Sequence, residues 1–213
     1  MARKDKNALL KMNSASNHSK TEREENDFYA TPTRMVGELL QHESFGPDIW
    51  EPCNGMGHIS DWFKDNKDIH VYKSDIIDRT SDTEILDFFG FDFSEKPEWL
   101  KPIINDCTIT ADIITNPPYS KGTEFYEHAC QLLGYGRKLA IFVKIQFLET
   151  QKRYELFKKF PPKSVLICVN RVHCGKDGKF NNEMASGGAA CYCWLIYEKG
   201  YTGKCIIDWI NKQ

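Results

Sequence analysis

A run of apolar residues that ends abruptly at two prolines constrains the fold of this chain more than any other segment. Residues 111–115 read Ala-Asp-Ile-Ile-Thr and are followed by Asn116-Pro117-Pro118-Tyr119. A β-branched run of this length predicts a buried strand, and the prolines end it because proline supplies no N–H to a sheet ladder. Asn116 and Tyr119 are therefore expected at the carboxyl end of a strand, where open α/β sheets bind ligands.

These four residues can grip a planar amino group. The side-chain oxygen of Asn116 and the carbonyl of Pro117 are two hydrogen-bond acceptors, and the ring of Tyr119 can cover the heterocycle that carries the amine. The arrangement suits methyl transfer to an exocyclic or amide nitrogen. The alternative is a plain strand that ends in a Pro-Pro turn, and four residues alone do not decide between the two.

A second strand-like segment, residues 49–52, leads into the glycine turn 53–57 and a helix predicted over 58–66. Strand, turn and helix in this order open a nucleotide-binding α/β unit. Glycines let the backbone approach a ligand closely, and Asp75, at the end of the next predicted strand, can accept both ribose hydroxyls. The third glycine of a pyrophosphate-binding fingerprint is missing, so a nucleoside with a cationic sulfonium beside Glu51 fits better than a dinucleotide.

The remaining periodicity completes one α/β domain. Strands are predicted over 70–75, 84–89, 139–147, 164–169 and 189–197, and helices over 121–133 and 150–160. An earlier helix is predicted to start with Thr31 as its N-cap and Pro32 as its first residue. We therefore expect a doubly wound, Rossmann-like, seven-stranded and mostly parallel sheet in a single domain over 27–213. Residues 1–26 are polar and are expected to form a flexible N-terminal extension.

Composition excludes several classes of protein. The 213 residues carry a formal net charge of −2, and no apolar stretch approaches the roughly 20 residues that span a bilayer. The first residues lack an apolar signal region, so we expect a cytoplasmic protein. Eight cysteines fall partly inside strand-like runs without paired C-x-x-C spacing, and we expect neither a disulfide framework nor a metal site.

Positive charge is concentrated between residues 137 and 180, where the chain has eleven Lys or Arg and three Asp or Glu. Such a run is often only a solvated helix face. Beside a nucleobase site it becomes a surface that can follow a phosphate backbone. The residues expected to contact nucleic acid are Lys121, Lys152, Arg153, Arg171, Lys176 and Lys179.

The motifs occur in the order found in one enzyme family. Tyr29-x-Thr31-Pro32, Glu51-Pro52-x-x-Gly55-x-Gly57, Asp75, Asp87-Phe88 and Asn116-Pro117-Pro118-Tyr119 resemble the motifs of S-adenosylmethionine-dependent N6-adenine DNA methyltransferases of the small stand-alone bacterial and phage type. The likeness covers roughly residues 27–210 and includes Ser186-Gly187-Gly188 downstream. Cys53 and Asn54 depart from the small residues often found in the glycine turn.

The resemblance implies a role for each motif. Asn116, Pro117, Pro118 and Tyr119 would form the catalytic grip on a flipped adenine. The residues that would bind S-adenosyl-L-methionine are Tyr29, Thr31, Pro32, Glu51, Cys53, Gly55, Gly57, Asp75, Ile76, Asp87, Phe88 and Asn116. The implied reaction is methyl transfer to the N6 amino group of adenine in DNA, in the cytoplasm of a bacterial or phage-infected cell.

Other substrates and roles stay open at this point. The same Asn-Pro-Pro-Tyr grip serves RNA adenine methyltransferases and the glutamine-amide methyltransferases of release factors. The chain could also be a non-catalytic S-adenosylmethionine-binding subunit of a larger assembly. No large target-recognition domain is predicted, so the loops 90–106 and 171–188 would have to read bases, or a partner chain would supply specificity. The sequence does not indicate an oligomeric state.

Overall fold

The computed structural model describes residues 29–172, 174–176 and 190–210. Its main sheet has eight strands in the order β12-β9-β11-β8-β7-β2-β3-β4. These strands are β2 (Asp48–Glu51), β3 (His70–Asp75), β4 (Glu84–Ile85), β7 (Asp112–Thr115), β8 (Lys138–Lys144), β9 (Ser164–Cys168), β11 (Tyr192–Glu198) and β12 (Ile206–Ile210). Neighbours are parallel except where β11 pairs with β8 and β9. The predicted fold class is confirmed, with eight strands instead of seven.

The strand order reverses between β2 and β7. From β2 the chain proceeds outward to β3 and β4, then returns to β7 and proceeds to β8 on the other side. In open α/β sheets, ligands bind in the crevice outside the carboxyl ends of the strands at such a reversal. The glycine turn follows β2 and Asn116 follows β7, so the fold brings these two motifs to the same end of adjacent strands.

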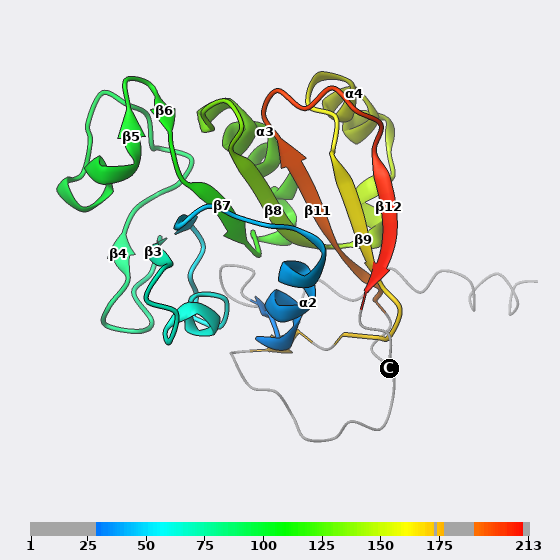
Figure 1. The fold of residues 1–213 in the computed structure, drawn as a ribbon, viewed down its shortest axis with the longest axis horizontal. Coiled ribbons are helices and arrows are strands. Elements are labelled where there is room, and N and C mark those ends of the chain that lie inside the picture. The colour runs from blue at the N-terminus through cyan, green and yellow to red at the C-terminus, as the bar shows by residue number, and fades with distance from the viewer. Residues whose placement is uncertain (1–28, 173, 177–189, 211–213) are drawn as a thin grey trace, which may run out of the picture.

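Helices cover both faces of the sheet (Figure 1). The helix α2 (Arg34–His42) lies on one face, and α3 (Gly122–Leu132) and α4 (Gln151–Lys159) lie on the other. Adjacent residues of β7 show why, since Ile114 packs in the core with α2 and Ile113 packs in the core with α3. A strand alternates its side chains between faces, and a buried parallel strand therefore needs apolar residues on both.

Smaller elements join this framework. The strand β1 (Tyr29–Ala30) pairs with β10 (Gly175–Lys176), and β5 (Ile104–Asn105) pairs with β6 (Thr108–Ile109). Short 3₁₀ helices are formed by Ser60–Phe63, Glu98–Ile103, Tyr119–Lys121 and Ile145–Leu148. Within the described ranges, none of the helices has the length and apolar character needed to cross a membrane.

Two helix predictions are wrong, one in where the helix starts and one in its length and type. The helix α2 begins at Arg34 after Thr33, because the Thr31 hydroxyl binds Asn116 instead of capping the helix. The helix predicted over 58–66 is only the 3₁₀ turn Ser60–Phe63. The hydroxyl of Ser60 bonds inside the glycine turn, and side chains that bond locally in this way compete with regular helix.

Two strand predictions also need correction. The strand predicted over 84–89 ends at Ile85, because the Asp87 carboxylate accepts the Phe89 N–H at 3.0 Å and forms a turn. The strand β12 was not predicted at all. It lies at the sheet edge, where Ile206, Ile207 and Trp209 stay at least half exposed, so the segment lacks the continuous apolar pattern of a buried strand.

Candidate active site

A cavity of about 510 Å³ lies at the carboxyl ends of β2, β3 and β7. This volume is in the range of small-molecule sites. The predicted residues that line it are Tyr29, Thr31, Glu51, Cys53, Asp75, Ile76, Asp87, Phe88, Asn116, Pro118 and Lys121. The predicted residues Pro32, Gly55, Gly57, Pro117 and Tyr119 are not part of this lining. The fold thus gathers motifs from distant parts of the chain around one cavity.

Asn116 is held in a fixed orientation at the cavity wall. Its side-chain nitrogen donates to the Tyr29 carbonyl at 2.7 Å and to Thr31 Oγ1 at 2.9 Å. Its side-chain oxygen is buried and has no hydrogen-bond partner among the described residues. A buried acceptor left unpaired costs about 1–3 kcal/mol, so this oxygen suits a ligand that brings an N–H donor.

Tyr119 is fixed beside the cavity by contacts on several sides. Its ring stacks on Tyr29 with centroids 5.1 Å apart and planes inclined by 20°, and its hydroxyl donates to the Tyr192 hydroxyl at 3.2 Å. Burial raises the pKa of Tyr119 well above its usual range, so the phenol stays neutral. The Lys144 ammonium lies 4.7 Å from the ring centroid.

The glycine turn owes its shape to backbone conformation and one carboxylate. Gly55 has φ 56° and Gly57 has φ 79°, in the left-handed region that favours glycine. The Gly55 N–H donates to Asp75 Oδ2 at 2.8 Å, which ties the turn after β2 to the end of β3. The two glycines therefore shape the wall of the cavity without lining it.

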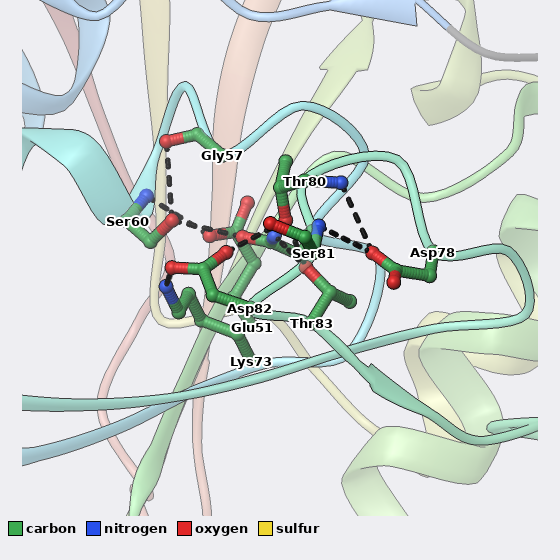
Figure 2. Close-up of polar contacts among 10 residues, drawn as sticks. Glu51, Gly57, Ser60, Lys73, Asp78, Thr80, Ser81, Asp82 and Thr83 are labelled. Atoms are coloured by element: carbon green, nitrogen blue, oxygen red, sulfur yellow. Dashed lines mark hydrogen bonds and ion pairs between the residues drawn. The ribbon is translucent and has the colours of Figure 1, made fainter.

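A hydrogen-bond network supports the turn from below (Figure 2). Asn54 donates to Thr83 Oγ1 at 2.5 Å and accepts from the Ser60 hydroxyl at 2.8 Å. Figure 2 shows the loop 78–83 bonded within itself, through Asp78, Thr80 and Ser81, and Asp82 pairs with Lys73. Sequence reasoning noticed Asn54 only as a departure from the family pattern, because its partner Thr83 is far away along the chain.

Glu51 places a buried carboxylate in the cavity wall. The residue is 1% exposed, and its Oε2 accepts the Ser60 N–H at 2.9 Å. Burial raises the pKa of the Glu51 carboxyl well above its usual range, and the nearby Asp75 adds to the rise. A cationic ligand in this cavity would stabilise the ionised carboxylate.

The polar lining residues that the sequence analysis did not single out include His58 and Arg79. Arg79 Nη1 lies 3.4 Å from Asp75 Oδ1 at the cavity edge. Burial lowers the pKa of His58. His58 follows the glycine turn and Arg79 follows β3. The sequence around each residue has no pattern that would predict a binding site.

Two aromatic side chains, Phe88 and Phe125, line part of the cavity. Phe88 is buried, stacks on Phe125 with centroids 4.2 Å apart, and meets Trp50 edge-on at 5.4 Å. Asp87 is exposed at the rim. Asp87 and Phe88 both line the cavity, so it offers a carboxylate that can accept from an amino group and a ring that can pack against a flat heterocycle.

The predicted nucleic-acid residues are dispersed. Lys121 is at the cavity rim, whereas Lys152 pairs with Glu124 at 2.6 Å and the Arg153 guanidinium stacks over Phe147 at 4.5 Å. Arg171 is exposed and donates to Cys191 Sγ at 2.8 Å. Lys176 belongs to β10. Lys179 and Ser186-Gly187-Gly188 lie outside the described residues.

The cysteines show no ligand geometry. Among the described residues, no group of three His, Cys, Asp or Glu side chains is arranged to hold a metal ion. Burial raises the pKa of both Cys168 and Cys193 to about 12, which keeps these two as thiols. His173, which sits within the cysteine-rich part of the sequence, is outside the described residues.

Comparison with solved structures identifies proteins of similar fold, whereas comparison of sequences finds no match. No protein-family model matches the chain, and no curated protein matches it in sequence. A Listeria monocytogenes structure described as a class I S-adenosylmethionine-dependent methyltransferase aligns with TM-score 0.52 and 14% identity over 96% of this chain and 71% of the other. A Lactococcus lactis protein described as a hemolysin aligns with TM-score 0.52 and 11% identity, covering 83% of this chain and 91% of the other.

A type I restriction-modification methyltransferase subunit from Streptococcus thermophilus aligns with TM-score 0.56 and 12% identity over 84% of this chain. The alignment covers 47% of that subunit, so this chain spans about half of its length. Identities at this level show the fold alone. The chain has the class I methyltransferase fold.

Proposed function

We propose that this chain transfers the methyl group of S-adenosylmethionine to the N6 amino group of adenine in DNA. The observation that carries the proposal is the buried, unpaired side-chain oxygen of Asn116, held at the cavity wall by bonds from its own nitrogen to Tyr29 and Thr31. An amino group on a flat ring supplies the N–H that this oxygen lacks.

The cavity has suitable partners for each part of the cofactor. Glu51 would bind the cationic methionine part, and Asp75 would bind the ribose hydroxyls. Asp87 and Phe88 would bind the adenine. The fit rests on chemistry, since a buried carboxylate with a raised pKa gains from a positive charge beside it. When bound, the cofactor supplies an electrophilic methyl group. Similarity of fold to class I methyltransferases supports this assignment.

The chain's own contribution to the reaction is orientation and charge stabilisation. Adenine's amino nitrogen is a weak nucleophile because its lone pair is delocalised into the ring. Acceptors on its two hydrogens, Asn116 Oδ1 and the Pro117 carbonyl, favour pyramidal geometry and stabilise the positive charge that develops on nitrogen. No side chain has to remove a proton beforehand. Holding the reacting atoms about 3–3.5 Å apart supplies much of the remaining acceleration.

A DNA substrate is supported by the motif order and by the fold of restriction-modification methyltransferase subunits. The target base would have to leave its stack, which costs a few kcal/mol in a duplex and less in a single strand. Sequence preference would come from the loops at the cavity mouth or from a partner chain.

The test is mass spectrometry of nucleosides after incubating the purified chain with methyl-labelled S-adenosylmethionine and DNA, RNA or a mixture of proteins. Labelled N6-methyladenine from DNA is the expected product. Label in RNA or protein, with none in DNA, would overturn the choice of substrate. Cofactor binding without transfer to any of the three would instead indicate a non-catalytic subunit.

A further inference from the structure

Lys144 is a lysine beside the candidate site that the proposed function does not use. It is the last residue of β8, the strand next to β7, and therefore lies near the end that carries Asn116. Its side chain is half-buried. Several basic residues of the same segment, including Lys138, Lys152 and Lys163, form ion pairs with glutamates. No carboxylate from the described residues is paired with the Lys144 ammonium.

The Lys144 ammonium flanks the stacked rings of Tyr29 and Tyr119. Its nitrogen is 4.7 Å from the Tyr119 centroid and 6.0 Å from the Tyr29 centroid, and the two centroids are 5.1 Å apart. If the ammonium lay directly across Tyr119 from Tyr29, the distance to Tyr29 would be close to the sum of the other two. It is much shorter, so the ammonium lies close to both rings and not directly across Tyr119 from Tyr29.

The Tyr29 ring marks where a second flat ring can stack on Tyr119. The centroid separation and the small angle between planes are those of a stacked aromatic pair. The Tyr119 hydroxyl is tied to Tyr192, which fixes the plane that any stacked ring must match. A base that took the place of the Tyr29 ring would lie close to the Lys144 ammonium, which is 6.0 Å from the Tyr29 centroid. An ammonium has three N–H donors and no acceptor, so it can hydrogen-bond only to an acceptor of that base.

We propose that Lys144 donates a hydrogen bond to a ring nitrogen of the target purine and so helps to select the base. The inference rests on the proposed adenine methylation. Adenine carries ring-nitrogen acceptors next to its amino group, whereas guanine carries a ring N–H at position 1. Asn116 and Lys144 together would then read complementary features, the first accepting from the amine and the second donating to the ring.

The experiment compares single-turnover methylation of oligonucleotides that carry adenine, 1-deazaadenine, 3-deazaadenine or 7-deazaadenine at the target position. Wild type, Lys144→Met and Lys144→Arg are assayed, and Lys158→Met, an exposed lysine of α4, is the matched control. Methionine keeps the stem without the charge. Thermal unfolding shows that each variant is folded.

With adenine, Lys144→Met is expected to lose roughly 10- to 100-fold in methylation rate, the usual effect of losing a charge-assisted hydrogen bond. Lys144→Arg should recover part of this loss, and Lys158→Met should match wild type. On one deaza analogue the wild type should already be slow, and Lys144→Met should cost nothing more. Such non-additive losses in rate show that the lysine and the ring nitrogen absent from that analogue interact with each other.

An equal loss for Lys144→Met on adenine and on all three analogues would overturn the inference, because it would assign the ammonium to a phosphate or to packing. Unchanged methylation by Lys144→Met would also overturn it. Either result leaves adenine methylation by the wild type intact. Failure of the wild type to methylate any adenine oligonucleotide would instead overturn the proposed function, and this inference with it.

Discussion

Two regions that line or support the cavity satisfy their polar groups in opposite ways. The region that we propose binds the cofactor, called here the cofactor wall, consists of the turn 53–57, Ser60 and the loop 78–83, and its side chains bond to one another, as Asn54 does with Ser60 and Thr83. The acceptor wall, which consists of Tyr29, Thr31, Asn116 and Tyr119, fixes the Asn116 nitrogen and leaves its oxygen unpaired. The first region forms its hydrogen bonds within itself, whereas the second keeps one buried acceptor that a ligand could satisfy.

This difference predicts that mutations in the two walls separate stability from activity. Losing Asn116 should remove the oxygen proposed to contact the reacting group, so its main effect is expected on activity; its cost in folding is confined to the two bonds that its nitrogen donates to Tyr29 and Thr31. Losing a member of the cofactor wall should break bonds that the folded protein already has. The predictions below follow from this contrast, from the largest effect to the smallest.

Asn116→Ala is expected to lower the rate of methyl transfer by roughly 10²–10³-fold, the usual effect of removing one group that stabilises developing charge. Cofactor affinity, measured by calorimetry, should change little by comparison. Thr31→Val is the matched control, since it keeps the Asn116 oxygen but removes one bond that orients the amide. It should lose less than Asn116→Ala. A larger loss of cofactor binding than of rate in Asn116→Ala would contradict the contrast between the walls.

Asn54→Ala is expected to destabilise the protein by about 1–3 kcal/mol, because it removes one buried hydrogen bond from Ser60 and one from Thr83. Denaturant unfolding measures this loss. Asn66→Ala, on an exposed loop, is the control and should change the free energy of unfolding by less than about 0.5 kcal/mol. Equal stability of the two variants would mean that the network in Figure 2 does not hold the turn.

Glu51→Gln should raise the stability of the cofactor-free protein at neutral pH, on the order of 1 kcal/mol, and weaken cofactor binding. Because burial raises the folded-state pKa of Glu51, the wild type is penalised for ionising it, and its stability falls as pH rises from about 4.5 through the raised pKa. The glutamine variant lacks this dependence. The free energies of unfolding of the wild type and the variant should therefore diverge as pH rises. A constant difference between them across this pH range would show that burial does not disfavour the ionised form of Glu51.

Gly57→Ala should cost about 1 kcal/mol in stability, because alanine is disfavoured at φ 79°. Gly136→Ala is a close control, with φ 76° and open space around the added carbon, and should cost a similar amount. The variants should differ in cofactor affinity, which only Gly57→Ala lowers. Equal cofactor affinity in both would remove the glycine turn from the account of the binding site.

The sequence predicted features that depend on neighbours in the chain. The strand that ends before Asn116 and the helix α3 both formed, with small changes in their boundaries, because apolar periodicity and proline act locally. The fold class followed from the order of such elements. Glu51, Asp75 and Phe88 line one cavity, and their roles there stay predictions. Parallel strands bring their carboxyl ends to one edge of the sheet, which is why sequence order could suggest such a grouping.

The features that sequence missed depend on contacts across the fold. Thr31 looked like a helix cap, but its hydroxyl bonds to Asn116, 85 residues away. The stacking of the Tyr119 ring on Tyr29 was not predicted, and the role of Tyr119 toward a base stays a prediction. Asn54 finds its partner in a loop that reads as ordinary surface sequence. No local pattern encodes such pairs, because they exist only once the sheet has assembled.

The most direct test is a crystal structure of the chain with an adenine oligonucleotide and a non-reactive analogue of S-adenosylmethionine. We expect the N6 atom of an unstacked adenine about 2.7–3.2 Å from the Asn116 side-chain oxygen, and on the side that faces the analogue. A structure in which that oxygen contacts only solvent or protein, while the adenine binds elsewhere, would contradict the account.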